Sequence, residues 1–194
     1  MKKIAFILCL TLCFYSCKSS KHSKKSSINH PSISSRPSKP TIDTDNSQRT
    51  LTKYPSLSEL RHRNSNSKLA DDIIDYAEKF EGVRYKYGGT TKKGMDCSGL
   101  VTTAFSSEGI SLPRSSSDIA LSGDWIDIKE VQKGDLLFFA TNKKSRKVNH
   151  VALVTFVNEG QVEFIHSTTS AGVITSSLAE HYWYFAFVEA RRVL

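Results

Sequence analysis

Cys97 is the residue of this sequence whose surroundings point most directly to covalent chemistry. It stands in the segment Asp96-Cys-Ser-Gly99, at the start of a helix predicted over 97–107 with Asp96 as its N-cap. The first turn of a helix presents unpaired backbone N–H groups and the positive end of the helix dipole, and both favour a thiolate. The N–H of Cys97 is also a natural donor to the oxyanion of a tetrahedral intermediate. We therefore predict a cysteine nucleophile.

The other cysteines are predicted to be absent from the folded enzyme. Residues 1–16 begin Met-Lys-Lys and continue as a short apolar run that includes Cys9 and Cys13, which is typical of a secretory signal peptide. Cys17 then follows Ser16 as the acceptor of a bacterial lipid anchor, although Phe14-Tyr15 departs from the usual residues of that box and leaves ordinary cleavage nearby as the alternative. Cys97 is then a single thiol in an oxidising compartment, where cysteines usually pair.

His150 and His166 are the candidates for a base and for the group that orients it. They stand at the start of one predicted strand and at the end of the next, joined by the link Asn158-Glu159-Gly160. A three-residue loop places both imidazoles on one face of the sheet, whereas a two-residue loop would place them on opposite faces. Two histidines on one face could also bind a metal, but no third ligand has a suitable spacing. We expect a thiolate–imidazolium pair and neither metal nor cofactor.

The elements that must position these residues follow from hydrophobic periodicity. A helical stripe predicts a first helix over 67–80, and a third, short helix is expected near Ser115. The rest of the chain holds short β-rich runs separated by turn residues. They cover 136–140, 150–157, 161–167, 173–176 and 185–193. Helices followed by strands predict an α+β domain in which N-terminal helices pack on an antiparallel sheet.

Several segments resemble, in order, the motifs of the NlpC/p60 family of papain-like cell-wall peptidases. The nucleophile motif is Tyr85-Lys-Tyr-Gly-Gly-Thr-Thr-Lys-Lys-Gly-Met-Asp-Cys-Ser-Gly-Leu-Val101. The later ones are Leu112-Pro-Arg-Ser115, Gly134-Asp-Leu-Leu-Phe-Phe139, Asn149-His-Val151 and Phe164-Ile-His-Ser-Thr168, and the ending Glu189-Ala-Arg-Arg-Val-Leu194 is similar to that of the family's murein DD-endopeptidase lipoproteins. The resemblance covers about 70–194, and so the whole predicted catalytic domain, 67–194.

The resemblance implies a role for each matching residue. Cys97 matches the nucleophile, His150 the base and His166 the polar residue that orients it. Tyr85 matches an active-site tyrosine, for which Tyr87 is the alternative. Asp96 and Ser98 match positions that flank the nucleophile and contact the substrate.

The charge of the chain is concentrated before the predicted domain. The net charge is +8, but residues 1–40 hold eight Lys or Arg and no acidic residue, and residues 41–194 are balanced. The segment 17–66 is rich in Ser, Lys and Pro, which predicts a disordered basic tether beside the lipid anchor. A nucleic-acid partner is therefore not expected.

These observations predict a monomeric peptidoglycan endopeptidase that is held in the periplasm by a lipid, at the outer membrane of a Gram-negative bacterium. Its substrates are stem peptides, cut at the D-alanyl–diaminopimelate cross-link. The alternatives are cleavage at the γ-D-glutamyl–diaminopimelate bond, and a papain-like amidase or acyltransferase. A wall-binding protein without catalysis is a third class, but a binding module has no use for the cysteine and both histidines together.

Overall fold

The computed structural model describes residues 55–194. The predicted signal peptide, the lipidation of Cys17 and the tether up to residue 54 lie outside the described residues and stay predictions. Within 55–194, no helix combines the length and the apolar character that crossing a membrane requires.

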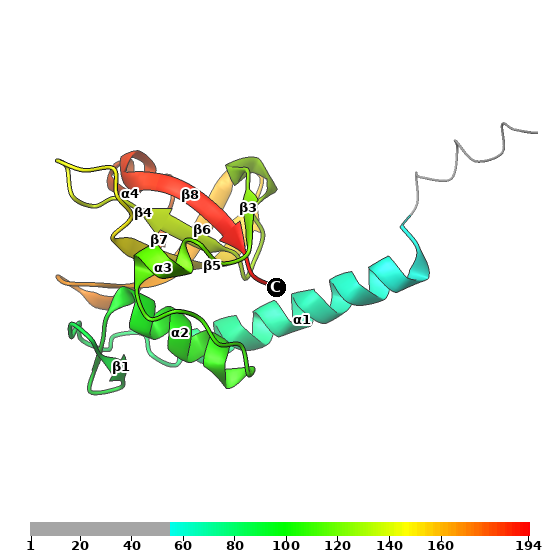
Figure 1. Ribbon diagram of the computed structural model, residues 1–194, viewed down its shortest axis with the longest axis horizontal. Coiled ribbons are helices and arrows are strands. Elements are labelled where there is room, and N and C mark those ends of the chain that lie inside the picture. Colours follow the sequence, from blue (N-terminus) through cyan, green and yellow to red (C-terminus); the bar gives the residue numbers. More distant parts are fainter. Residues whose placement is uncertain (1–54) are drawn as a thin grey trace, which may run out of the picture. The chain divides into compact units, whose positions relative to one another are not determined.

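Helix α1, Leu57–Glu78, starts ten residues before the predicted helix. Its first residue follows a capping box: the Oγ of Ser56 accepts the N–H of Glu59, and the Glu59 carboxylate accepts the N–H of Ser56 at 2.6 Å. The buried residues all lie in the second half, from Ala70 onward, and the first turns extend away from the sheet (Figure 1). The prediction that the tether reaches residue 66 is therefore wrong, because an exposed helix has no apolar stripe to reveal it.

Helix α2, Cys97–Ser107, has the predicted bounds and the predicted cap, since the Asp96 side chain accepts the N–H of Gly99. Its apolar side is buried between α1 and the sheet. The short helix expected near Ser115 is α3, Ser116–Ile119, capped by the Ser115 hydroxyl. A small hairpin of β1, Thr90–Thr91, and β2, Gly94–Met95, precedes α2.

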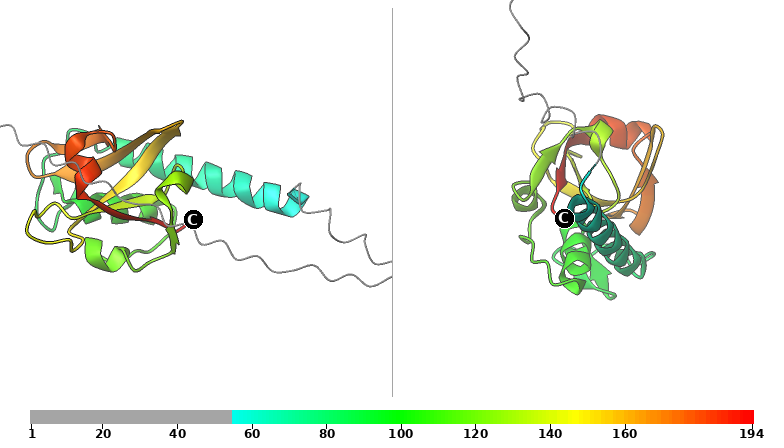
Figure 2. Two further views of the ribbon diagram at one scale, coloured as in Figure 1. Left: turned by 90° about the horizontal axis from the view of Figure 1, so that it is seen from above. Right: turned by 90° about the vertical axis from the view of Figure 1, so that its right-hand side faces the viewer.

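Six antiparallel strands form the main sheet, in the order β3-β8-β4-β5-β6-β7. The bounds are β3 Asp124–Ile126, β4 Leu136–Phe139, β5 His150–Asn158, β6 Gln161–Thr168, β7 Gly172–Ser177 and β8 Phe187–Arg192. Helices α1 and α2 lie beside one face of this sheet (Figures 1 and 2). The α+β fold is thus confirmed.

Three further elements were not predicted. Strand β3 and the 3₁₀ turn Ile128–Glu130 were not expected, and residues 181–186 form helix α4, His181–Ala186, so the strand predicted from residue 185 begins at Phe187.

Both faces of the sheet are covered, which explains its continuous apolar runs. Along β4, Leu136 and Phe138 point into the core shared with α1 and α2, whereas Leu137 and Phe139 point into a second core with Trp183 of α4. Strand β5 alternates in the same way over its buried half. The sheet is therefore a rigid middle layer, and the ends of its strands are well fixed positions for reactive groups.

The hairpin that carries both histidines reaches the predicted register by another route. Near the turn, Asn158 pairs with Gln161, so the loop has two residues, Glu159 and Gly160, and not three. A β-bulge between Val154 and Phe156 then absorbs one residue of β5, and Leu153 pairs with Ile165 as a three-residue loop would require. The loop prediction is wrong, but the bulge restores the shared face of the histidines.

Candidate active site

Cys97 lies at the N-terminus of α2, held against the backbone of two other segments. Its thiol faces backbone N–H groups of Cys97 itself, of Ser98 and of Val151 in β5. Gly99 allows this close packing, because a Cβ there would lie only 2.1 Å from the carbonyl oxygen of Gly89. The sulfur is therefore fixed beside the first residues of β5.

The protonation of Cys97 differs from the sequence-based expectation. Burial raises the pKa of the thiol, and the neighbouring Asp96 carboxylate raises it further. The N–H groups at the helix start do lower the pKa, as expected, but burial outweighs them. Without substrate, the cysteine is therefore a neutral thiol.

His150 and His166 form a chain of side chains with Ser176 of β7. The Nε2 of His150 lies 2.9 Å from the Nδ1 of His166, and the Nε2 of His166 lies 3.1 Å from the Ser176 Oγ. The Nε2 of His150 is therefore occupied by the hydrogen bond to His166. The Nδ1 of His150 remains as the nitrogen that can exchange a proton with Cys97 or with substrate. The structure thus brings the two predicted histidines together, and adds Ser176, which sequence reasoning did not single out.

Both imidazoles are neutral at physiological pH. Burial lowers the pKa of His150 to about 4. Burial, and next the repulsion from a proton on His150, lower the pKa of His166 to about 3. A neutral His150 can accept a proton, which is what a base must do.

Trp183 of α4 covers both histidines on the side of the second core. Its indole stacks on His150, with ring centroids 5.4 Å apart and planes 22° apart, and meets His166 edge-on at 4.5 Å. Phe139 and Phe164 pack around the same indole. This residue was missed, because its segment His-Tyr-Trp-Tyr-Phe-Ala carries no local signal of a contact across the sheet.

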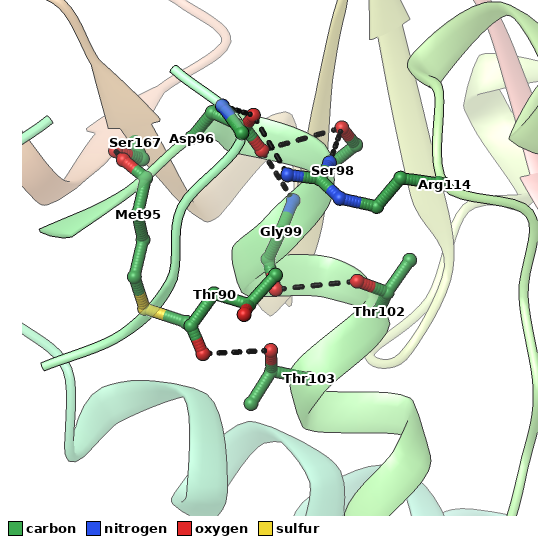
Figure 3. A network of polar contacts seen from close by, with 10 residues as sticks. Thr90, Met95, Asp96, Ser98, Gly99, Thr102, Thr103, Arg114 and Ser167 are labelled. Atoms are coloured by element: carbon green, nitrogen blue, oxygen red, sulfur yellow. Dashed lines mark hydrogen bonds and ion pairs between the residues drawn. The ribbon is translucent and has the colours of Figure 1, made fainter. Parts of the chain in front are cut away.

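Asp96 and Ser98, expected to contact substrate, are buried in a polar network with Arg114 (Figure 3). Arg114 donates to the Asp96 carboxylate at 2.8 Å and to the Ser98 hydroxyl at 2.7 Å. Burial alone would raise the pKa of Asp96, but the hydrogen bonds from Arg114 and from the N–H groups of Gly99 and Gly88 lower it below its usual value. The ionised carboxylate therefore fixes the start of α2. Arg114 belongs to the motif at 112–115, but no role was assigned to it from sequence.

A hydrogen bond between Ser167 and Met95 joins the histidine strands to the cysteine segment. The Ser167 hydroxyl donates to the carbonyl of Met95 at 2.8 Å, which ties the strand of His166 to the segment that leads into Cys97 (Figure 3).

Tyr85, Cys97 and His150 line one pocket of about 490 Å³. The turn after β6 and the first residues of α4 form further walls of this pocket. The remaining lining residues are Thr141, Asn149, Ser167, Thr168, Thr169, Ser170, Ile174, Ser176, Glu180, Tyr182 and Trp183. Burial, followed by the nearby Cys97 and Asp96, raises the pKa of Tyr85, which keeps its hydroxyl protonated. Among residues 55–194, no group of three His, Cys, Asp or Glu side chains is placed to hold a metal ion.

Two relatives match the chain over similar spans. A probable endopeptidase NlpC homolog of Haemophilus influenzae is 40% identical over 134 residues, which is 68% of this chain and 68% of that protein. The murein DD-endopeptidase MepS/murein LD-carboxypeptidase of Escherichia coli is 39% identical over 130 residues, 66% of this chain and 65% of that protein. The matched part of this chain thus spans about two thirds of each relative's length.

Solved structures and a family model agree with these matches. The crystal structure of an NlpC/P60 family protein of Bacillus cereus has a TM-score of 0.58 at 36% identity, and covers 64% of this chain and 40% of that one. The model of the NlpC/P60 family matches residues 82–192, which contain Cys97, His150 and His166. On its sequence and on its papain-like α+β fold, the chain belongs to the NlpC/P60 family.

Proposed function

We propose that this protein is a cysteine-type peptidoglycan endopeptidase with Cys97 as nucleophile and His150 as base. The observation that carries the proposal is one pocket that holds both the thiol at the start of α2 and a histidine oriented by His166 and Ser176. Relatives named as endopeptidases, among them a murein DD-endopeptidase, support the substrate class.

The reaction begins with a proton transfer inside a buried pair. Burial disfavours a charge on either Cys97 or His150 alone, so the proton moves from Sγ to the Nδ1 of His150 as the sulfur attacks the amide carbonyl. The backbone N–H of Cys97 is a donor for the developing oxyanion. His150 then gives the proton to the leaving amine, and an acyl-enzyme thioester remains.

Deacylation reverses the proton path. A water molecule gives a proton to His150 while its oxygen attacks the thioester carbonyl. The C–S bond then breaks, the stem-peptide carboxylic acid leaves, and the thiol of Cys97 recovers its proton from His150. His166 and Ser176 hold the imidazole in one orientation through both steps.

For the bond, we propose the D-alanyl–diaminopimelate cross-link, which the name of the Escherichia coli relative supports. The second candidate is a γ-D-glutamyl bond within one stem, because a γ-D-glutamyl-L-lysine dipeptidyl-peptidase of Bacillus cereus is also 40% identical, over 98 residues. An amidase or acyltransferase would use the same thiol on another amide.

Digestion of purified cross-linked stem dimers, with products weighed by mass spectrometry, tests this choice. Cleavage of the cross-link yields intact tetrapeptide monomers, which is the expected result. Release of fragments that bear L-Ala-D-Glu would assign the γ-D-glutamyl bond instead. Products joined to an added amine in place of water would assign an acyltransferase.

We also propose that the chain is exported and anchored through a lipid on Cys17, at the periplasmic side of the outer membrane. Its sequence before residue 55 supports this, and one copy carries every proposed site residue, which supports a monomer. Cys17→Ala should move the protein from the membrane fraction to the soluble one. Wild-type protein that is already soluble, or that takes up no fatty-acid label, would contradict the anchor.

A further inference from the structure

The connection between β4 and β5 carries an unusual local charge. Lys143, Lys144, Arg146 and Lys147 stand within five residues, and we call 143–147 the basic loop. Residues 55–194 hold 17 basic and 17 acidic side chains in all, so this excess is not a general property of the domain. All four cationic side chains of the loop are exposed.

The basic loop begins and ends at the rim of the active-site pocket. Thr141 and Asn149, which flank it, both line that pocket together with Cys97 and His150. The Asn149 side-chain oxygen accepts the N–H of Thr141 at 2.8 Å and its hydroxyl at 3.1 Å, so the two ends are fastened together. The loop lies at the same end of the molecule as the turn between β6 and β7, which forms another wall of the pocket (Figures 1 and 2).

Arg146 holds the basic loop in place through two hydrogen bonds. Its guanidinium donates to the carbonyls of Phe185 and Phe187 at 3.0 and 2.9 Å, which joins the loop to the end of α4. Asn142 and Ser145 also accept N–H groups from within the turn, at 3.0 and 3.2 Å. The backbone of the basic loop is therefore shaped, not merely a solvated run of charge.

The three lysines of the basic loop have no such partner. Lys143, Lys144 and Lys147 form no ion pair with any carboxylate of residues 55–194. Three exposed ammonium groups on one held loop repel one another, which a bound anion relieves. Arg146 therefore has a structural role, whereas the three lysines are available to bind an anion beside the pocket.

We propose that Lys143, Lys144 and Lys147 form an anion subsite for the free carboxylates of the stem peptide that enters the pocket. This deepens the proposed function and rests on it. Stem peptides carry carboxylates on glutamate, diaminopimelate and terminal alanine, so a peptide with its amide at Cys97 presents negative charge around the rim. Continuity with the pocket favours a peptide ligand over an anionic lipid surface.

The test compares kcat/KM on a stem peptide and on the same peptide with its carboxylates amidated. In the variant Lys143→Gln/Lys144→Gln/Lys147→Gln, kcat/KM on the free-acid peptide should fall about tenfold, the sum of three modest surface interactions. On the amidated peptide the variant and the wild type should agree. Added NaCl, from about 0.05 to about 0.3 M, should reduce the wild-type preference for the acid and leave the variant unchanged.

A matched control removes the same charge elsewhere. Lys68→Gln/Lys79→Gln/Lys129→Gln alters three exposed lysines that do not line the pocket, and should behave as the wild type on both peptides. Equal loss in both triple variants, or equal loss on acid and amidated peptides, would overturn the subsite. So would unchanged hydrolysis combined with lost binding to anionic vesicles, which would assign the loop to a lipid surface. A wild type that cuts neither peptide would instead refute the proposed function.

Discussion

At the scale of single residues, burial decides the protonation of the proposed catalytic pair. The same desolvation that raises the pKa of Cys97 lowers that of His150, so both groups are uncharged before substrate binds. Among residues 55–194, the only side chain that hydrogen-bonds to the His150 imidazole is His166, which in turn contacts Ser176. His150 is therefore the proposed base and His166 the group that orients it, although both are buried.

Substitution of the histidines separates a base from an orienting group. His150→Ala should reduce kcat by at least about 10³-fold, whereas His166→Gln should keep much more activity, because an amide can still accept a hydrogen bond from the imidazole. Steady-state kinetics on purified muropeptides measures both. Equal losses, or the reverse order, would show that the roles are misassigned.

Trp183 should set the pH at which His150 becomes protonated. The wild-type acid limb of kcat/KM is expected near the pKa of His150, about 4, because below it the base already carries a proton. Trp183→Leu admits water to the imidazole and weakens the desolvation that lowers this pKa. The limb should then move upward, toward the ordinary value of 6.5.

Trp125→Leu is the control for this experiment. It makes the same chemical change at an exposed tryptophan of β3, and the limb should stay where it is. An acid limb that does not move in Trp183→Leu would show that stacking leaves the protonation of His150 unaffected.

At the scale of elements, the sequence predicted features that depend on neighbouring residues better than contacts between distant segments. The bounds of α2 were predicted because the cap Asp96 and the apolar side of the helix are both readable in sequence. The capping box of α1, Ser56 to Glu59, is also visible in the sequence, but no apolar stripe follows it to indicate a helix. The contact of Trp183 with His150 arises only when α4 packs across the sheet, and no local pattern encodes it.

The β5–β6 hairpin shows how a correct placement can rest on a wrong premise. The turn has one residue fewer than predicted, and a bulge at Thr155 adds one unpaired residue to β5. The two changes cancel, so the register beyond the bulge is the predicted one. A bulge is stabilised by what packs on the sheet around it, so sequence spacing alone does not locate it. The bulge is what places His150 and His166 on one face.

Deletions within the hairpin test the bulge directly. Removing Thr155 takes out the extra residue, so Val154 can still pair with Phe164 and most activity should survive. Removing Glu163 from the facing strand leaves β5 two residues too long and should abolish turnover. Circular dichroism would check that both variants fold, and an inactive Thr155 deletion with a native spectrum would contradict this role of the bulge.

At the scale of the whole molecule, the last strand is held in the domain by a buried ion pair. Arg192 of β8 donates two hydrogen bonds of 2.8 Å to the buried carboxylate of Asp135, next to β4, and one to the carbonyl of Glu130. Arg192 thus fastens the C-terminal strand to the turn before β4, within the sheet that carries the histidines. This strand belongs to the segment that resembles the ending of the DD-endopeptidases.

Loss of this arginine should destabilise the domain without touching the pocket. Arg192→Ala leaves Asp135 buried and unpaired and should lower the free energy of unfolding by about 3 kcal/mol. Urea denaturation measures the change. Lys68→Ala, which breaks an exposed ion pair with Asp72 on α1, should leave the free energy of unfolding nearly unchanged. Similar losses in the two variants would contradict the importance of the buried pair.

The central claim is that the thiol of Cys97 performs the reaction, and turnover of purified muropeptides by Cys97→Ser tests it most directly. Serine is close to cysteine in size and shape, so the fold should persist, but its hydroxyl is a far weaker nucleophile when the base is the neutral imidazole of His150. The account predicts no detectable hydrolysis by a variant with a wild-type circular dichroism spectrum. Retention of about a tenth or more of wild-type turnover would contradict it.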